Sequence, residues 1–280
     1  MIPALIKWAG GKSRLADRIG QMLGPCHGTY IEPFIGSAAV FLARRAAGAI
    51  DDAILSDLNP QLINMYRWVR DDVDALLSAL DQLPLDGWEA AYYDVRRDYN
   101  EAEGETVIQA ARMIWLNRAG FNGLYRVNRK GKYNVPKGRY AHLSIPHTDT
   151  FRSVSAALQG VDLRCCGYEE VVAEAGETDQ VYCDPPYLPD RKGGFSSYAR
   201  LPFGLDQHVE LSTACREAAG RGARVLLSNH DVDAARATLY READGWDLTA
   251  LEVARSVSRS SGTRKPVPEL LASIGPWSPS

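Results

Sequence analysis

The sequence predicts an α/β fold, a sheet interrupted by an inserted, mainly helical segment. Short apolar runs of β type alternate with helical patterns along most of the 280 residues, and this alternation is typical of a sheet with helices on its faces. The alternation stops between about residues 73 and 160, which indicates an insertion. We therefore expect residues 1–58 and 161–280 to form one domain and residues 59–160 a second. A hydrophobic content of 45% is sufficient for a sizeable core.

The expected strands are short apolar runs that end at polar or small residues. They are Thr29–Glu32, Ala53–Asp57, Gln180–Asp184, Ala223–Ser228, Trp246–Glu252 and Glu269–Ser273. The expected helices between them are Ser13–Leu23, Ser37–Ala46, Pro60–Arg70, Leu205–Ala219 and Val232–Tyr240. Asn59 before Pro60 predicts an N-cap followed by proline at the first helical position.

The insertion is expected to be helical up to Leu116 and then to change character. Its large side chains recur at helix spacing at Trp88, Tyr92, Val95 and Tyr99. Residues 117–140 are instead punctuated by glycine and asparagine, and residues 128–133 (Asn-Arg-Lys-Gly-Lys-Tyr) predict a β-hairpin turn between short strands.

Basic residues are concentrated in this insertion, although the whole chain has a formal net charge of −3. Residues 112–140 contain no acid, and their eight basic residues are Arg112, Arg118, Arg126, Arg129, Lys130, Lys132, Lys137 and Arg139. A second acid-free stretch, residues 253–268, contains four more basic residues. Basic faces on an acidic body favour a polyanion bound at one surface; the alternative is two solvated loops.

Cysteine, histidine and hydropathy patterns exclude several classes of site and protein. The five cysteines include no Cys-x-x-Cys pair and the five histidines no pair four residues apart, so we expect neither a disulfide framework nor a metal site. No run of eighteen apolar residues is present, and the N-terminus lacks the basic-then-apolar order of a signal peptide. We expect a soluble, cytoplasmic protein with no membrane partner.

Three acidic residues end predicted strands, which is where open α/β sheets bind their ligands. Glu32 is followed by Pro-Phe-Ile-Gly-Ser, and small residues before a helix let a ligand approach the backbone. Asp57 ends the next strand, where an acid commonly accepts the ribose hydroxyls of an adenosine. Asp184 ends a third. The alternative for each acid alone is a turn residue, but the glycine turn and the following acid together favour a nucleoside cofactor.

Residues 8–13 (Trp-Ala-Gly-Gly-Lys-Ser) imitate the end of a phosphate-binding loop. That motif requires glycine where this chain has Ile6, so a P-loop NTPase is disfavoured. Gly10 and Gly11 instead permit close approach of a ligand to the backbone. Lys12 is then a candidate partner for a ligand carboxylate, and Trp8 is a candidate aromatic wall for a sulfonium or a base.

Residues 184–187 (Asp-Pro-Pro-Tyr) supply groups that can activate an exocyclic amine. The N6 amine of adenine is a poor nucleophile because its lone pair is delocalised into the ring. A carboxylate and a backbone carbonyl that each accept one N–H would draw this nitrogen towards tetrahedral geometry, and Asp184 and the Pro185 carbonyl suit these functions. The prolines stiffen the turn, and Tyr187 offers a stacking face. The alternative is a rigid turn in which Asp184 is a local acceptor.

Taken together, these segments resemble the D12 class (Dam-type) of DNA adenine-N6 methyltransferases over nearly the whole chain. The matching segments are residues 7–12 (KWAGGK), 32–36 (EPFIG), 56–59 (SDLN), 117–118 (NR), 121–126 (FNGLYR), 131–138 and 184–187 (DPPY), with weaker likeness at 227–229 and 255–271. Several motifs in the same order are more specific than any one. The resemblance implies a Rossmann-like, S-adenosylmethionine-dependent methyltransferase sheet with an inserted target-recognition domain that carries a β-hairpin.

The resemblance also implies roles for individual residues. S-adenosylmethionine is the implied cofactor, and the residues implied to border it are Trp8, Lys12, Glu32, Phe34, Gly36, Asp57 and Asp184. Asp184, Pro185 and Tyr187 are implied to hold a flipped adenine for catalysis. Double-stranded DNA is the implied partner, and the residues implied to bind it are Lys7, Asn122, Leu124, Arg126, Asn128, Arg129, Lys130, Lys132, Asn134, Lys137 and Arg139. The residues at the positions of Lys7, Leu124 and Arg126 touch bases in GATC-methylating relatives, so the resemblance suggests GATC as the site.

Two residues depart from the family pattern. Ala38 stands where relatives often have a second glycine, so the cofactor turn is expected to be less open. Lys137 replaces a usually apolar or aromatic residue before Gly138, which alters the expected hairpin contacts and adds a candidate phosphate contact.

Other functions stay open at this point. Other enzyme activities that fit the sequence are methyl transfer to N4 of cytosine and methylation of an RNA base or a protein amide. From another class, the chain could be an inactive, sequence-specific DNA-binding protein. We expect a monomer without metal that acts in a bacterial nucleoid or phage-infected cell, with any cognate restriction endonuclease acting separately.

Overall fold

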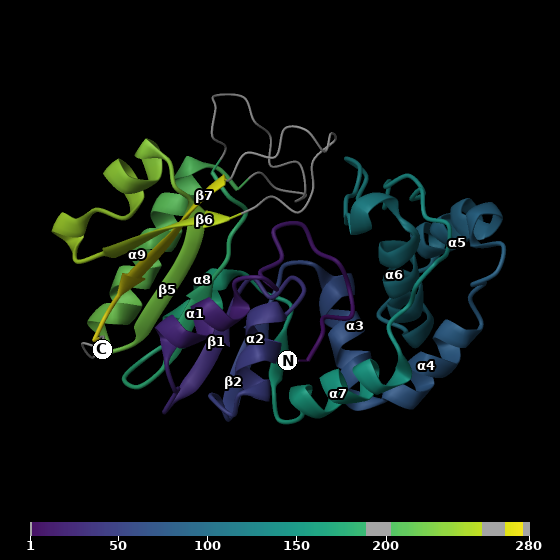
Figure 1. Cartoon of the computed structure of the whole chain (residues 1–280), viewed down its shortest axis with the longest axis horizontal. Helices are drawn as coiled ribbons and strands as arrows, with labels where there is room; N and C mark the ends of the chain where they lie inside the picture. The colour runs from purple at the N-terminus through teal and green to yellow at the C-terminus, as the bar shows by residue number, and fades with distance from the viewer. Residues whose placement is uncertain (1, 189–202, 254–266, 277–280) are drawn as a thin grey trace.

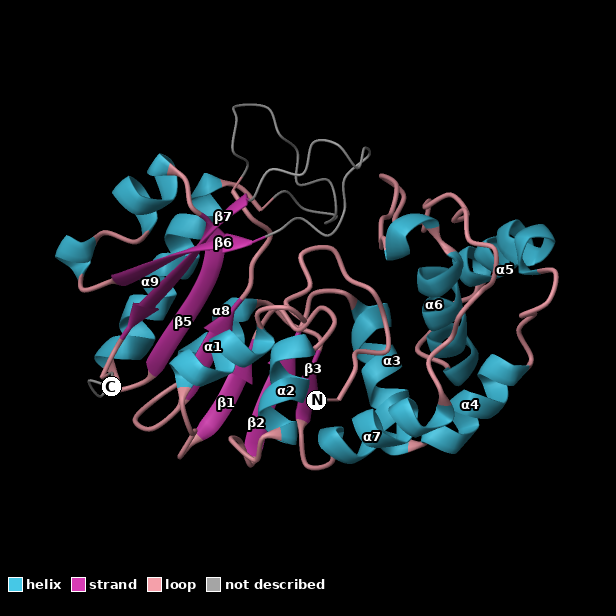
Figure 2. Ribbon diagram, viewed as in Figure 1, coloured by secondary structure: helices cyan, strands magenta, loops and turns pink. Residues whose placement is uncertain are grey.

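Seven strands lie side by side in one sheet (Figure 2). The computed structural model describes residues 2–188, 203–253 and 267–276. The strands are β1 (Thr29–Glu32), β2 (Asp52–Ser56), β3 (Asp162–Arg164), β4 (Gln180–Cys183), β5 (Arg224–His230), β6 (Asp247–Val253) and β7 (Val267–Ile274). Their order is β3-β2-β1-β4-β5-β7-β6, in which β1 to β5 are parallel and β7 is antiparallel to both of its neighbours.

The predicted α/β class is confirmed, and each predicted strand is present within two residues of its expected bounds. β3 was not predicted, because a strand of three residues is too short to show an apolar pattern. It pairs with β2, so that Leu163 lies beside Leu55.

Helices cover the sheet and build a separate group beside it (Figure 1). The α-helices are α1 (Ala16–Leu23), α2 (Ala39–Ala46), α3 (Pro60–Asp71), α4 (Val73–Asp81), α5 (Trp88–Glu101), α6 (Val107–Ala119), α7 (Thr148–Leu158), α8 (Tyr168–Glu174) and α9 (Leu205–Gly220). Three short helical turns are η1 (Phe121–Gly123), η2 (Ala235–Leu239) and η3 (Glu242–Asp244).

Alternate residues of the central strands enter two different cores. Tyr30 of β1 and Tyr182 of β4 join the core that includes α1, α2 and α3. Their neighbours Ile31 and Val181 join a second core with α8 and α9. Because successive side chains of a strand point to opposite faces, the sheet is the middle of three layers. β4 is buried at all four residues, as expected for a strand covered on both faces.

The chain leaves the sheet after β2 and returns to it with β3, and five helices lie between these strands. In Figure 1, α4, α5 and α6 gather at the end of the molecule opposite α9, while α3 and α7 lie between that group and the sheet. α6 is the centre of the group, because it contacts α3, α4 and α5. Its residues are buried on almost every side, which explains why it lacks an amphipathic pattern.

Two predicted helices begin or wind differently from expectation. The predicted Ser37–Ala46 helix begins at Ala39 because Ala38 has the left-handed φ of 56°. The predicted Val232–Tyr240 helix is replaced by the π-turn η2, closed by a hydrogen bond from the Tyr240 N–H to the Ala235 carbonyl. The wider turn buries both Leu239 and Tyr240.

Two other helices, α7 and α8, were not predicted, and α1 begins three residues later than expected. By contrast, Asn59 is the predicted N-cap of α3, and its side chain accepts hydrogen bonds from the Gln61 and Leu62 N–H groups. Among the described residues, no helix is long and apolar enough to cross a bilayer.

Candidate active site at the carboxyl edge of the sheet

The sheet order brings three acidic residues to one edge. Glu32 ends β1, Asp57 follows β2, and Asp184 follows β4. These strands are parallel neighbours in the order β2-β1-β4, so their carboxyl ends point the same way. The order along the sheet reverses between β1 and β4, and ligands of open α/β sheets bind at such a switch point.

The turn between β1 and α2 requires glycine at one position. Gly36 has φ of 46°, and a Cβ there would lie 2.7 Å from Cδ1 of Trp8, so the indole packs directly on the backbone. Tyr66 of α3 fixes the turn by donating a hydrogen bond to the Gly36 carbonyl at 2.9 Å. Ala38 adopts the left-handed conformation that a second glycine would adopt freely, at a cost of about 1–2 kcal/mol. The departure from the family pattern therefore keeps the turn's shape and strains it.

Asp57 is half-buried and held by backbone donors. Its carboxylate accepts a hydrogen bond from the Asn59 N–H at 2.9 Å and a longer one from the Gly36 N–H at 3.5 Å. Burial raises the pKa of the Asp57 carboxyl to about 6, although the two backbone hydrogen bonds act in the opposite direction. A carboxylate that titrates so close to neutral pH is unusual for a simple turn residue.

Glu32 is more deeply buried than Asp57, with 3% of its surface exposed. It accepts a hydrogen bond from the Tyr30 hydroxyl at 2.8 Å. Burial, with Asp184 nearby, raises the pKa of Glu32 to about 8, so the carboxyl is largely protonated at neutral pH. Phe34, two residues on, is half-buried; it stacks on Tyr168 and meets Phe203 edge-on, with ring centroids 5.7 and 5.8 Å apart.

Asp184 is paired with Lys12, which lies 172 residues earlier in the chain. The Lys12 ammonium lies 2.8 Å from Oδ1 and 2.9 Å from Oδ2 of Asp184, and it donates to the Gly10 carbonyl at 2.7 Å. Only 6% of Lys12 and 18% of the Asp184 side chain are exposed. Burial raises the pKa of Asp184 while Lys12 lowers it, so the ion pair opposes the cost of removing the carboxylate from water.

A second carboxylate, Glu269 of β7, completes this cluster. The Tyr187 hydroxyl donates a 2.7 Å hydrogen bond to Oε1 of Glu269, and the Lys12 ammonium lies 3.8 Å from the same oxygen. The ammonium also lies 4.6 Å from the centroid of the Tyr187 ring. Sequence reasoning missed Glu269 as a site residue. The available indication was an acid at the start of an otherwise apolar strand.

The Asp-Pro-Pro-Tyr turn is anchored to β5 by Asn229. The Asn229 Oδ1 accepts from the Leu188 N–H at 3.1 Å and from the His230 N–H at 2.8 Å. Its Nδ2 donates to the Tyr240 hydroxyl at 3.0 Å and lies 3.3 Å from Nδ1 of His208. Asn229 is fully buried, and it ties the chain after Tyr187 to β5 and to the side chains of Tyr240 and His208.

The N-terminal segment joins the sheet edge to the insertion (Figure 1). Asn117 of α6 accepts from the Lys7 N–H at 2.9 Å and donates to the Lys7 carbonyl at 2.8 Å. The Lys7 side chain is exposed, and its ammonium lies 4.8 Å from the centroid of the Tyr140 ring. Trp8 stacks on Tyr125 of the insertion, with ring centroids 5.6 Å apart, so the indole lies between the Gly36 turn and the basic segment.

The predicted hairpin segment folds back on itself around Asn128. The Asn128 N–H donates to the Lys132 carbonyl at 2.8 Å, and its side chain accepts from the Lys130 and Lys132 N–H groups. A single antiparallel bridge joins Val127 to Tyr133. Within the described part of the insertion no extended strand flanks the turn.

Several predicted DNA-binding side chains already have partners within the protein. Arg126 donates to the Asn134 side chain at 2.7 Å and to its carbonyl at 3.2 Å. The Lys132 ammonium donates to the carbonyl of Asn100 on α5. Leu124 is half-buried against the core.

The remaining predicted DNA-binding residues are exposed on the insertion: Asn122, Asn128, Arg129, Lys130, Lys137 and Arg139. Asn122 has a left-handed φ of 56°, and Lys137 forms an isolated bridge with Gly120. The basic residues of the second acid-free stretch, from Arg255 to Lys265, lie outside the described residues.

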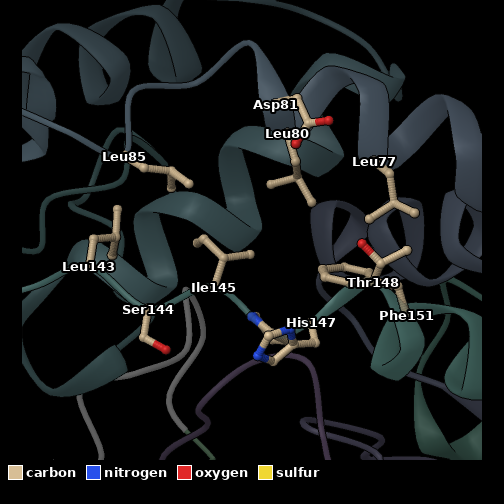
Figure 3. A pocket seen from close by; sticks show the side chains of 11 residues that line it. Leu77, Leu80, Asp81, Leu85, Leu143, Ser144, Ile145, His147, Thr148 and Phe151 are labelled. Carbon is tan, nitrogen blue, oxygen red and sulfur yellow. The ribbon is translucent and has the colours of Figure 1, made fainter.

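A cavity of about 400 Å³ lies away from the sheet edge, between α4 and the start of α7 (Figure 3). Apolar side chains such as Leu80, Ile145 and Phe151 line much of it. Asp81 and His147 also line it, but none of the residues of the carboxyl edge does. Within the described ranges, no three His, Cys, Asp or Glu side chains are grouped to hold a metal ion.

Comparison with known proteins decides the family. The profile of the D12 class N6 adenine-specific DNA methyltransferases matches residues 8–251. The chain belongs to this family. The DNA adenine methylase of Vibrio cholerae serotype O1 is 34% identical over 277 residues, covering 98% of this chain and 96% of the relative. That of Escherichia coli strain K12 is 35% identical over 278 residues, covering 98% and 95%.

A third relative, the DNA adenine methylase of Haemophilus influenzae, is 35% identical over 277 residues, covering 96% of this chain and 93% of the relative. As a D12 class protein, the chain is an adenine-specific DNA methyltransferase, and the resemblance inferred from the motifs is confirmed. The alternatives of N4-cytosine, RNA and protein-amide methylation have no support in these comparisons.

Proposed function

We propose that this D12 class enzyme transfers the methyl group of S-adenosylmethionine to N6 of an adenine rotated out of a short duplex site. The observation that carries the proposal is the buried Asp184 carboxylate. It directly precedes Pro185 at the carboxyl end of β4, and it is paired with Lys12 beside the glycine turn of β1. An acceptor carboxylate and an acceptor carbonyl therefore follow each other at the switch point of the sheet.

The edge of the sheet fits S-adenosylmethionine in shape and charge. Gly36 leaves no room for a Cβ beneath Trp8, so the indole packs on the turn and would itself form a wall of the cofactor site. Asp57 would accept the ribose hydroxyls, and Trp8 and Phe34 offer aromatic faces. The Lys12 ammonium is matched by two carboxylates, those of Asp184 and Glu269, which leaves a negative excess that suits a positively charged sulfur. When bound, S-adenosylmethionine would supply a methyl group on a sulfonium, and the neutral thioether that remains would be the leaving group.

Asp184, Pro185 and Tyr187 would then hold and orient the adenine. Rotating a base out of a duplex costs a few kcal/mol. Stacking on Tyr187 would return roughly 1–3 kcal/mol, and hydrogen bonds from N6 to Asp184 and the Pro185 carbonyl about 1 kcal/mol each. These gains nearly offset the cost of rotating the adenine out of the duplex, so contacts with the DNA phosphates decide how much of the flipped state is populated. Asp184 orients the lone pair and stabilises the positive charge that develops on N6.

The insertion, residues 59–160, is proposed to recognise the target. Arg129, Lys130, Lys137 and Arg139 would contact phosphates, because their side chains are exposed. Lys7, Leu124 and Arg126 would contact bases, with GATC as the suggested site. Because Arg126 is bonded to Asn134, reading a base requires it to exchange that partner for the base edge. The monomeric state, the bacterial or phage setting and a separately acting restriction endonuclease stay predictions.

A genome without adenine methylation tests the proposal. The chain is expressed in such cells, and modified positions are identified by sequencing. We expect N6-methyladenine at one short motif in duplex DNA. Methylcytosine at the motif, or no modified base when purified protein, S-adenosylmethionine and duplex are combined, would refute the proposal.

A further inference from the structure

The function proposed above uses Glu269 only as a negative charge beside the cofactor, yet Glu269 lies in the same cluster as Asp184. It is located on β7, beside His230 of β5 in the register of the sheet. Its exposed fraction is 8%, and a buried acid is retained only where it has partners. The Tyr187 hydroxyl and the Lys12 ammonium are those partners, at 2.7 and 3.8 Å from Oε1.

The Lys12 ammonium presents a difficulty for the function of Asp184. It donates hydrogen bonds to the Gly10 carbonyl and to Oδ2 of Asp184, and it lies 2.8 Å from Oδ1 of the same carboxylate. An adenine amine that approaches Asp184 must therefore compete with an ammonium that is already bound. In addition, a positive charge develops on N6 during transfer, and a like charge close by opposes it.

Glu269 resolves this difficulty because it offers the ammonium a second carboxylate. We propose that Glu269 is a positioning residue: it forms an ion pair with the Lys12 ammonium when Asp184 accepts the adenine amine. This proposal rests on the function proposed above. A movement of about 1 Å converts the 3.8 Å separation into a hydrogen-bonded ion pair. The Tyr187 hydrogen bond keeps Oε1 of Glu269 in place for this exchange. One negative charge then remains near the reacting nitrogen, where it favours the transition state.

Glu269→Gln separates charge from hydrogen bonding. The amide oxygen of Gln still accepts from Tyr187, but it no longer neutralises Lys12. We expect single-turnover methyl transfer to a one-adenine duplex, at saturating S-adenosylmethionine, to fall about ten- to a hundredfold, because a misplacement of about 1 Å in a catalytic site can cost as much as a hundredfold. Duplex affinity should stay within twofold. Glu217→Gln, on the exposed face of α9, is the matched control and should transfer at the parent rate.

A double-mutant cycle identifies the route of the effect. In a Lys12→Met background Asp184 has no ammonium to release, so Glu269→Gln should change the residual rate less than twofold. An equal loss in both backgrounds overturns the proposal, because a merely structural residue would act without Lys12. Tyr187→Phe keeps the Glu269 charge, so its fold loss of transfer rate should be at least three times smaller than that of Glu269→Gln. An equal or larger loss also overturns the proposal.

Glu269→Asp tests whether the charge at this position, and not the loss of the native side chain, sets the rate. It retains the charge and should recover at least a third of the parent rate, whereas a rate as low as that of Glu269→Gln overturns the proposal. The parent enzyme distinguishes the two hypotheses. If the parent transfers no methyl to duplex adenine, the proposed function itself fails. If the parent transfers and Glu269→Gln is equally fast, only the role of Glu269 fails.

Discussion

Lowering the pH should weaken cofactor binding through Asp57. Burial raises the pKa of this carboxyl to about 6 in the free protein, and only the ionised form can accept both ribose hydroxyls. At pH 7.5 about 97% of the carboxyl is ionised, and at pH 5 about 9%. The affinity for S-adenosylmethionine should therefore fall about tenfold over this range, which corresponds to about 1.4 kcal/mol. The affinity falls because binding needs the ionised Asp57 carboxylate. The raised pKa sets the pH range, since this ionised form is lost as the pH falls through about 6.

Isothermal titration calorimetry of S-adenosylmethionine at a series of pH values measures this effect. Asp57→Asn is the control, because its amide cannot titrate. It should bind weakly at every pH, and its affinity should change less than threefold between pH 7.5 and pH 5. Other groups of the site, including Asp184, contribute equally to both profiles. A flat profile for the parent, or the same tenfold loss in Asp57→Asn, would refute the reasoning.

Three further predictions concern the adenine and the duplex. Tyr187→Ala should remove most of the fluorescence gain of 2-aminopurine at the target position, since stacking on the ring returns roughly 1–3 kcal/mol; an unchanged gain would argue against stacking. Replacing both Arg129 and Lys130 by Ala should weaken binding to every duplex alike and reduce the salt slope by about two, and an undiminished slope would contradict a phosphate role. Arg126→Ala should relax preference at one base pair by about 1–3 kcal/mol, measured by competition between duplexes that differ there; unaltered preference would exclude base contact by Arg126.

The strand ends of the fold were predictable because each carries a local pattern. An apolar run followed by an acid located Glu32, Asp57 and Asp184 at strand ends, and the structure agrees. The Asn59-Pro60 pair likewise located the start of α3. These features depend only on neighbours in the chain, and their physical causes are short-range.

The ion-pair cluster was not predictable because it depends on the order of the strands. Lys12, Asp184 and Glu269 are separated by long stretches of chain, and Glu269 joins the other two because β7 pairs with β5. No local pattern in the sequence encodes that order. The internal partners of Arg126 and Lys132 were missed for the same reason, since both basic residues were treated as free for DNA.

Asp184→Ala tests the central claim most directly. Lys12 retains Glu269 as a counter-ion in this variant, so the fold and duplex binding should be kept, with dissociation constants within about threefold of the parent. Single-turnover methyl transfer to a duplex with one target adenine should fall by at least about a hundredfold, as for loss of an electrostatic contact to the reacting group. Transfer within tenfold of the parent rate would contradict the claim that the Asp184 carboxylate activates the adenine amine.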